Sequence, residues 1–99
     1  MKAETIREWI KSVRQYRAHD YRSDIVCKVW NRGMGRLDLF RFYPEQKIVL
    51  INTAICNRAD ERHLQTFLHT YGMEDYTLQR VNYGYPVYYN NSFGLHLAA

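Results

Sequence analysis

The sequence has little of what marks membrane, secreted or disulfide-bonded proteins. Its longest uninterrupted apolar stretch is residues 48–51, far short of the roughly 20 residues that a membrane-spanning helix needs. Charges recur throughout residues 1–20, which argues against a secretory signal. Cysteine occurs only twice, and two cysteines without a signal peptide do not make a disulfide framework. We therefore expect a cytoplasmic protein that does not enter a membrane.

Aromatic residues, in contrast, are abundant at 15% of the chain. Disordered segments are poor in them, so we expect a folded protein. A length of 99 residues suits one domain rather than two, and we predict a single domain over 1–99 with frayed ends at 1–4 and 94–99. Cys27 and Cys56 stand among apolar neighbours, which predicts that both are buried as small apolar side chains. A reducing environment fits such free cysteines.

Two segments have helical periodicity. Thr5 and Glu8 form a capping-box pattern, and apolar residues then recur at three- and four-residue steps, which predicts a helix from about residue 5 to 17. Asn57, with Asp60 three residues later, predicts the start of a second helix, and Gly72 predicts its end. The residues that we expect in the core between helices and sheet are Trp9, Val13, Ile48, Leu50, Leu64, Phe67 and Leu68.

Between these helices the sequence predicts three antiparallel strands, at 24–30, 37–43 and 47–53, with a polar connector at 19–23. Two glycines within 31–36 predict a hairpin loop. After the second helix we predict strands at 77–82 and 87–90. The order α-β-β-β-α-β-β indicates an α+β fold, a single small domain with two helices packed on an antiparallel sheet.

Through residue 71 the predicted order is similar to that of double-stranded-RNA-binding domains. In that family the start of the second helix is basic and meets phosphate. Here this position carries Asp60 and Glu61, which we expect to repel phosphate. The likeness therefore concerns element order alone.

The sequence contains no recognisable catalytic or metal-binding constellation. His63 and His69 are six residues apart on one predicted helix, so they cannot bind one zinc ion together. His19-Asp20 resembles the dipeptide of metal phosphohydrolases, but the further ligands of such a site are missing. Phosphate-binding glycine loops and nucleophile elbows are absent. We therefore expect no cofactor, no metal site and no enzymatic activity.

Positive charge is concentrated in the first third of the chain. Residues 1–36 hold nine Lys/Arg against four Asp/Glu, and the other 63 residues hold five against six. Such one-sided charge is expected where a face meets an acidic partner or a phosphate backbone, although a basic solvated surface also produces it. On the predicted first helix, Arg7, Lys11 and Arg14 fall on one solvent-facing flank.

Two further features predict a binding surface. Arg32 and Arg36 flank a bend with two glycines, so that both guanidinium groups can reach one ligand, whereas the simpler interpretation is a plain hairpin loop with solubilising arginines. Tyr83, Tyr85 and Tyr88 belong to a dense aromatic segment. Tyrosine and arginine are enriched in binding hot spots, and aromatic rings also stack on nucleic-acid bases. The alternative is that these rings pack on the sheet's second face, and we expect this to account for about half of them.

These observations favour a small non-enzymatic binding protein that acts stoichiometrically on an acidic protein or nucleoprotein partner through a basic, tyrosine-rich surface. In size and general character the chain resembles compact inhibitors of phages and mobile elements, such as anti-CRISPR proteins. The alternatives are a DNA- or RNA-binding module and a small metal-dependent nuclease. The oligomeric state stays open. The candidate binding residues are Arg7, Lys11, Arg14, Arg32, Arg36, Tyr83, Tyr85 and Tyr88.

Overall fold

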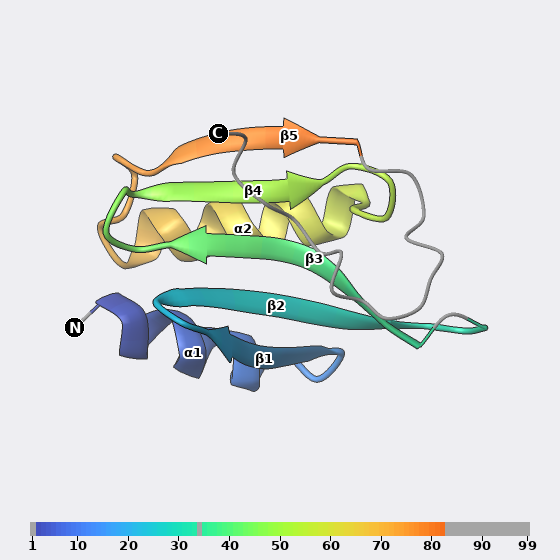
Figure 1. Cartoon of the computed structure of the whole chain (residues 1–99). Helices are drawn as coiled ribbons and strands as arrows, with labels where there is room; N and C mark the ends of the chain where they lie inside the picture. Colours follow the sequence, from blue (N-terminus) through green and yellow to red (C-terminus); the bar gives the residue numbers. More distant parts are fainter. Residues whose placement is uncertain (1, 34, 83–99) are drawn as a thin grey trace.

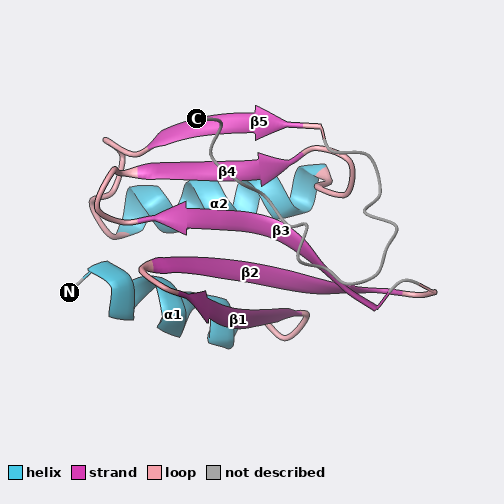
Figure 2. Cartoon of the chain, viewed as in Figure 1, coloured by secondary structure: helices cyan, strands magenta, loops and turns pink. Residues whose placement is uncertain are grey.

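One sheet of five strands runs through the protein, and both helices lie on the same face of it (Figure 1, Figure 2). The structure is a computed structural model that describes residues 2–33 and 35–82. The elements in chain order are α1 (Lys2–Ser12), β1 (Tyr16–Tyr21), β2 (Asp24–Asn31), β3 (Gly35–Tyr43), β4 (Ile48–Asn52), α2 (Arg58–Thr70) and β5 (Thr77–Val81). Within this part of the chain, neither helix is long and apolar enough to cross a membrane.

The strands are arranged in sequence order, β1-β2-β3-β4-β5. The first four strands pair antiparallel with one another in succession, because short turns connect them. β5 instead pairs parallel with β4, since α2 carries the chain back across the helical face before β5 begins. The register of β2 against β3 shifts between Cys27 and Lys28, which leaves Leu39 as the extra residue of a bulge.

The α+β prediction is confirmed, and α2 begins and ends as its sequence predicts. The Asn57 side chain accepts a hydrogen bond from the Asp60 backbone N–H at 2.8 Å, and the Asp60 carboxylate accepts one from the Asn57 N–H at 3.2 Å. This reciprocal capping box satisfies donors that the first helical turn leaves open. Gly72, just beyond the helix, has a φ of +69°, the left-handed conformation that favours glycine.

The prediction for the first helix was wrong in extent, and it missed a strand. α1 ends at Ser12, and residues 16–21 form β1 instead of a helix end followed by a connector. Tyr16 and Ala18 pack toward the helices, so the residue that ended the predicted apolar stripe is buried from a strand. The physical cause is non-local, because β1 pairs with β2 along its whole length, from Tyr16 opposite Val29 to Tyr21 opposite Asp24. The element order is therefore α-β-β-β-β-α-β in the described residues, and the predicted strand at 87–90 lies outside them.

The main core lies between the sheet and the two helices. Leu64, Phe67 and Leu68 of α2 are buried there as predicted, and Trp9 and Val13 pack against the same cluster. The Trp9 and Phe67 rings stack with centroids 4.5 Å apart, which joins α1 to α2. The other members are mostly Ile6 and Ile10 of α1 and strand residues Ile25, Cys27, Phe40, Phe42, Val49 and Ile51.

Two of the predicted core residues, Ile48 and Leu50, do not lie in this core but in a second cluster. Leu50 is fully buried, but it clusters with Tyr43, Ile48 and Val81 on the sheet face that points away from the helices. Side chains of neighbouring strand residues point to opposite faces, so Leu50 cannot share a face with Val49 and Ile51. The continuous apolar run 48–51 therefore serves both faces of a central strand, as its composition predicts. We call the face opposite the helices the open face, because neither α1 nor α2 lies on it.

Candidate functional site

Ion pairs divide the basic residues into two groups. Arg7, Lys28, Arg41, Lys47 and Arg80 each pair with a carboxylate. Most acidic side chains are used in these pairs, so they do not balance the remaining cations. Among the residues that the structure describes, the cations without a carboxylate partner are Lys2, Lys11, Arg14, Arg17, Arg22, Arg32, Arg36, Arg58 and Arg62.

Arg7 lies in the paired group, and the helix flank predicted for it does not form. Its Nε donates to both carboxylate oxygens of Asp20, at 2.9 and 3.1 Å, and its Nη1 donates to Glu4 at 3.0 Å. The hydrogen bond with Asp20 raises the pKa of the Arg7 guanidinium. Lys11 is exposed near the end of α1, whereas Arg14 lies beyond the helix in the connection to β1. The structure therefore does not place these three residues on one helical flank.

The β2–β3 hairpin presents an exposed tryptophan together with two arginines, Arg32 and Arg36. Trp30 is 62% exposed and faces Arg36 across the ladder. The Arg36 guanidinium lies over the indole, with its central carbon 5.6 Å from the ring centroid, a cation–π arrangement. Arg32 is exposed in the loop that follows β2. We call Trp30, Arg32 and Arg36 the hairpin cluster.

The hairpin glycines explain how the loop turns. Gly33 and Gly35 have φ values of +97° and +83°, which confirms the interpretation that the bend needs glycine. Space around them is not the reason, because an added Cβ would meet no described atom within 4 Å at either position. Residue 34 lies outside the described residues. The sequence pattern identified both arginines of the cluster, but it overlooked Trp30, which the alternation along 24–30 places opposite the apolar side chains.

β1 adds a row of exposed polar and aromatic side chains to the open face. Arg17, His19 and Tyr21 stand opposite Lys28, Val26 and Asp24 of β2, so they share the open face with Trp30. We call Arg17, His19, Tyr21 and Trp30 the open-face row. Arg17, His19 and Tyr21 were not among the candidate binding residues, because their alternation becomes visible only once β1 is recognised as a strand.

Tyr21 resembles Trp30 in its surroundings. Tyr21 is 47% exposed, and the guanidinium carbons of Arg41 and Arg22 lie 4.9 and 5.7 Å from its ring centroid. Arg41 is buried and also lies over Tyr43 at 5.7 Å, so it holds the Tyr21 ring against the sheet. Both exposed rings of the open face are therefore paired with guanidinium groups.

The carboxylates of the open face are neutralised by partners on neighbouring strands. Asp24 accepts a hydrogen bond from Arg41 at 3.0 Å, and Asp38 lies 2.7 Å from the ammonium nitrogen of Lys28. These side chains are largely buried, so each pair is screened from solvent and unable to reach out to a ligand. The charges that this part of the sheet exposes are consequently positive.

The cysteines are poorly suited to act as nucleophiles. Cys27 is fully buried, and burial raises the pKa of its thiol well above the ordinary value. Burial also raises the pKa of Cys56, to about 11, and the nearby Asp60 carboxylate adds to the effect. Both thiols therefore stay protonated at neutral pH. Among the described residues, no group of three or more His, Cys, Asp or Glu side chains is placed to hold a metal ion.

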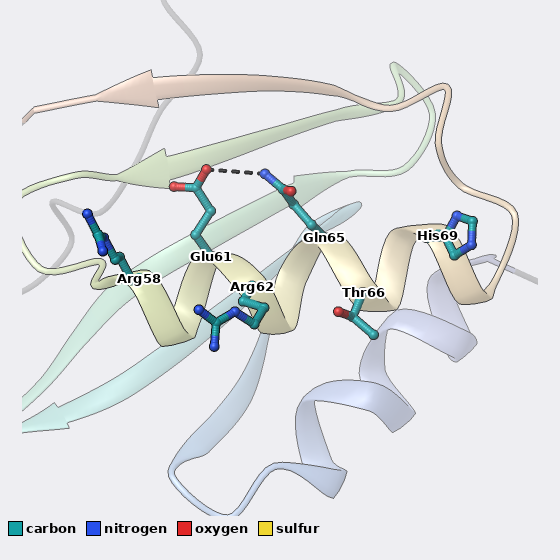
Figure 3. Close-up of a pocket in the computed structure, with 6 residues that line it drawn as sticks. All are labelled: Arg58, Glu61, Arg62, Gln65, Thr66 and His69. Carbon is teal, nitrogen blue, oxygen red and sulfur yellow. Dashed lines mark hydrogen bonds between the residues drawn. The ribbon is translucent and has the colours of Figure 1, made fainter.

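The outer side of α2 carries two more exposed arginines, Arg58 and Arg62. It has a hollow lined by Arg58, Glu61, Arg62, Gln65, Thr66 and His69 (Figure 3). Glu61 accepts a hydrogen bond from Gln65 at 3.2 Å and pairs with Arg80. Asp60 accepts one from the Tyr16 hydroxyl at 2.8 Å. Both acidic residues at the start of α2 are thus engaged within the protein, which weakens the repulsion of phosphate that we expected there. This hollow lies on the helical side of the sheet, away from the open face.

Three of the candidate residues, Tyr83, Tyr85 and Tyr88, lie outside the described residues. The structure thus places Arg32 and Arg36 on one hairpin, adds Trp30 to them, and leaves Lys11 near the end of α1 and Arg14 in the connection to β1. Comparison with protein families, curated proteins and solved structures gave no match to this chain.

Proposed function

We propose that the chain is a stoichiometric binding protein that attaches to a negatively charged macromolecule through the hairpin cluster. The observation that carries this proposal is the 62% exposure of Trp30 beneath the Arg36 guanidinium. Tryptophan and arginine are the residue types most enriched in binding hot spots. An indole that remains open to water while a cation covers one side of it offers both apolar area and charge to a partner.

Charge around the hairpin supports a negatively charged partner. Lys11, Arg14 and Arg17 are exposed in or near the connection between α1 and β1, and none has a carboxylate partner among the described residues. β1 begins opposite the end of β2, with Tyr16 facing Val29, so this connection and the hairpin lie at the same end of the sheet (Figure 1). Cations gathered at one end attract an anionic surface more strongly than scattered ones do.

Binding without catalysis accounts best for the described side chains. Their raised pKa values keep both thiols protonated, and the carboxylates of the open face are neutralised by ion pairs with Lys28 and Arg41. General acid–base or nucleophilic catalysis needs such groups to be available at a substrate. An acidic protein, a nucleoprotein and a nucleic acid all supply the negative charge that the proposal requires.

Charge reversal at the hairpin tests the proposal. Polyglutamate and a single-stranded oligonucleotide serve as two anionic probes. Whichever of them the native chain binds, the variant Arg32→Glu with Arg36→Glu should no longer bind. Its melting temperature should change little, because exposed charges contribute about 0–1 kcal/mol each to stability. Arg58→Glu with Arg62→Glu is the matched control, since it reverses the same charge on α2. Normal binding by the hairpin variant would exclude the hairpin cluster from the binding surface.

A further inference from the structure

Resting on this proposed function, we infer that the negatively charged partner is a single-stranded nucleic acid whose bases stack along the open-face row. Tyr21 and Trp30 mark the two ends of this row. Tyr21 stands opposite Asp24, and Asp24 and Trp30 point to the same face of β2. At about 3.3 Å per residue the two rings are separated by roughly 20 Å along the sheet.

The space between the two rings is filled by side chains of suitable chemistry. His19 and Arg17 point to the same face as Tyr21, and both are exposed. Alternate residues of a strand are about 6.6 Å apart, so β1 presents the Tyr21 ring, the His19 imidazole and Arg17 in succession. Trp30 follows on β2, two residues beyond Lys28, which stands opposite Arg17. The Arg17 guanidinium donates to the carbonyl oxygens of Arg14 and Tyr16, at 3.0 and 2.8 Å, which leaves its charge without a carboxylate.

The composition of this row favours nucleic acid over an acidic protein. A protein interface has a contiguous apolar core, whereas the exposed large apolar side chains among the described residues are Tyr21, Trp30 and Tyr71. The first two are far apart, and polar residues separate them. Each has an arginine over its ring. A nucleotide matches this pairing, because its base offers a π face to the ring while its phosphate reaches the guanidinium.

The row also favours single strands over duplexes. In a duplex the bases are stacked on each other and their faces are closed to protein rings, whereas the bases of a single strand can be splayed onto a sheet. The carboxylates near the row do not oppose the phosphates, because Lys28 and Arg41 neutralise Asp38 and Asp24. The row therefore combines stacking rings with unopposed positive charge, as sequence-tolerant single-strand binders do.

Fluorescence anisotropy of labelled oligonucleotides tests this inference. A single-stranded probe of about ten nucleotides, as DNA and as RNA, is compared with the duplex of the same sequence. Trp30→Ala and Tyr21→Leu should each weaken binding of the single strand between about 5- and 150-fold, the usual effect of losing one stacking ring. Leucine at position 21 keeps an apolar contact for Arg41 and removes the π face. Tyr71→Ala is the control, because Tyr71 is 53% exposed but belongs to the C-cap of α2.

The salt dependence gives a second, independent measure. If Arg17, Arg22, Arg32 and Arg36 each neutralise one phosphate, affinity should fall about 50-fold between roughly 50 and 200 mM salt. Equal affinity for the duplex, or an equal loss in Tyr71→Ala, would overturn the inference. Binding of polyglutamate alone, lost on charge reversal at Arg32 and Arg36, would overturn it while the proposed function stands. If neither probe binds, both proposals fail.

Discussion

Truncation of Phe67 to alanine should test how the two helices are held on the sheet. Phe67 is 3% exposed, stacks on Trp9 with an interplanar angle of 11°, and meets Phe42 edge-on with centroids 6.4 Å apart. One side chain of α2 thus contacts both α1 and β3. Its removal opens a cavity where three elements meet, and the aromatic neighbours cannot collapse into it without leaving their own contacts.

The expected magnitude follows from these contacts. Large-to-small substitution of a buried phenylalanine costs about 3–5 kcal/mol, and a domain of this size has a total stability of about 5–15 kcal/mol. A loss of about 4 kcal/mol corresponds to a fall in melting temperature of roughly 15–30 °C. Phe67→Leu keeps most of the apolar volume but removes the ring, so it should lose less than the alanine variant does.

Urea denaturation followed by circular dichroism measures these differences. Thr66→Ala is the control, because Thr66 is the exposed neighbour on the same helix and its substitution should change stability by less than about 0.5 kcal/mol. A double-mutant cycle of Phe67→Ala with Trp9→Ala should give a coupling of about 0.5–1.5 kcal/mol. If Phe67→Ala costs less than 1 kcal/mol, the packing of α1 on α2 described above is wrong.

Four other predictions concern local structure. Asn57→Ala removes the acceptor of the α2 capping box and should cost about 1 kcal/mol in urea denaturation, and an unchanged midpoint would refute that role. Gly35→Ala forces a side chain to a φ of +83° and should cost about 1–2 kcal/mol, unlike a substitution at an exposed strand residue. At pH 8 both cysteines should react with iodoacetamide far more slowly in the native than in the unfolded chain. Because unfolded thiols ionise near pH 9 and Cys56 does so at about 11, its contribution to stability should be lost as the pH rises between these values. Cys56→Ser should reduce this loss of stability at alkaline pH. An unchanged dependence of stability on pH would contradict the raised pKa of Cys56.

The parts of the fold that could be predicted are those with local causes. The capping box of Asn57 and Asp60, and the glycine beyond α2, lie within the helix and its immediate neighbours, so the sequence alone defines them. The turn at Gly33 and Gly35 is equally local. The apolar residue at position 16 fitted a helical stripe and an alternating strand equally well, and only pairing with β2 decides between them. The face on which Leu50 lies could not be predicted either, because an unbroken apolar run has no alternation.

The same difference between local and non-local causes applies to the residues of the candidate site. Arg32 and Arg36 were identified because the hairpin that carries them is a local feature. Arg7 was identified from its position on a helix, yet Asp20, the residue that neutralises it, comes from the strand that the sequence did not reveal. His19 and Tyr21 were missed for the same reason. A binding surface that spans two strands becomes visible only when their register is known.

The face of the sheet that meets the partner can be identified directly. A titration of the isotope-labelled protein with a single-stranded oligonucleotide, followed by amide ¹H–¹⁵N correlation spectra, reports this residue by residue. We predict that the backbone amides of residues 17–21 and the indole N–H of Trp30 shift progressively, while those of α2 keep their positions. Shifts confined to residues 58–70, or no shift at an excess of oligonucleotide, would contradict the assignment of the open face as the surface that binds nucleic acid.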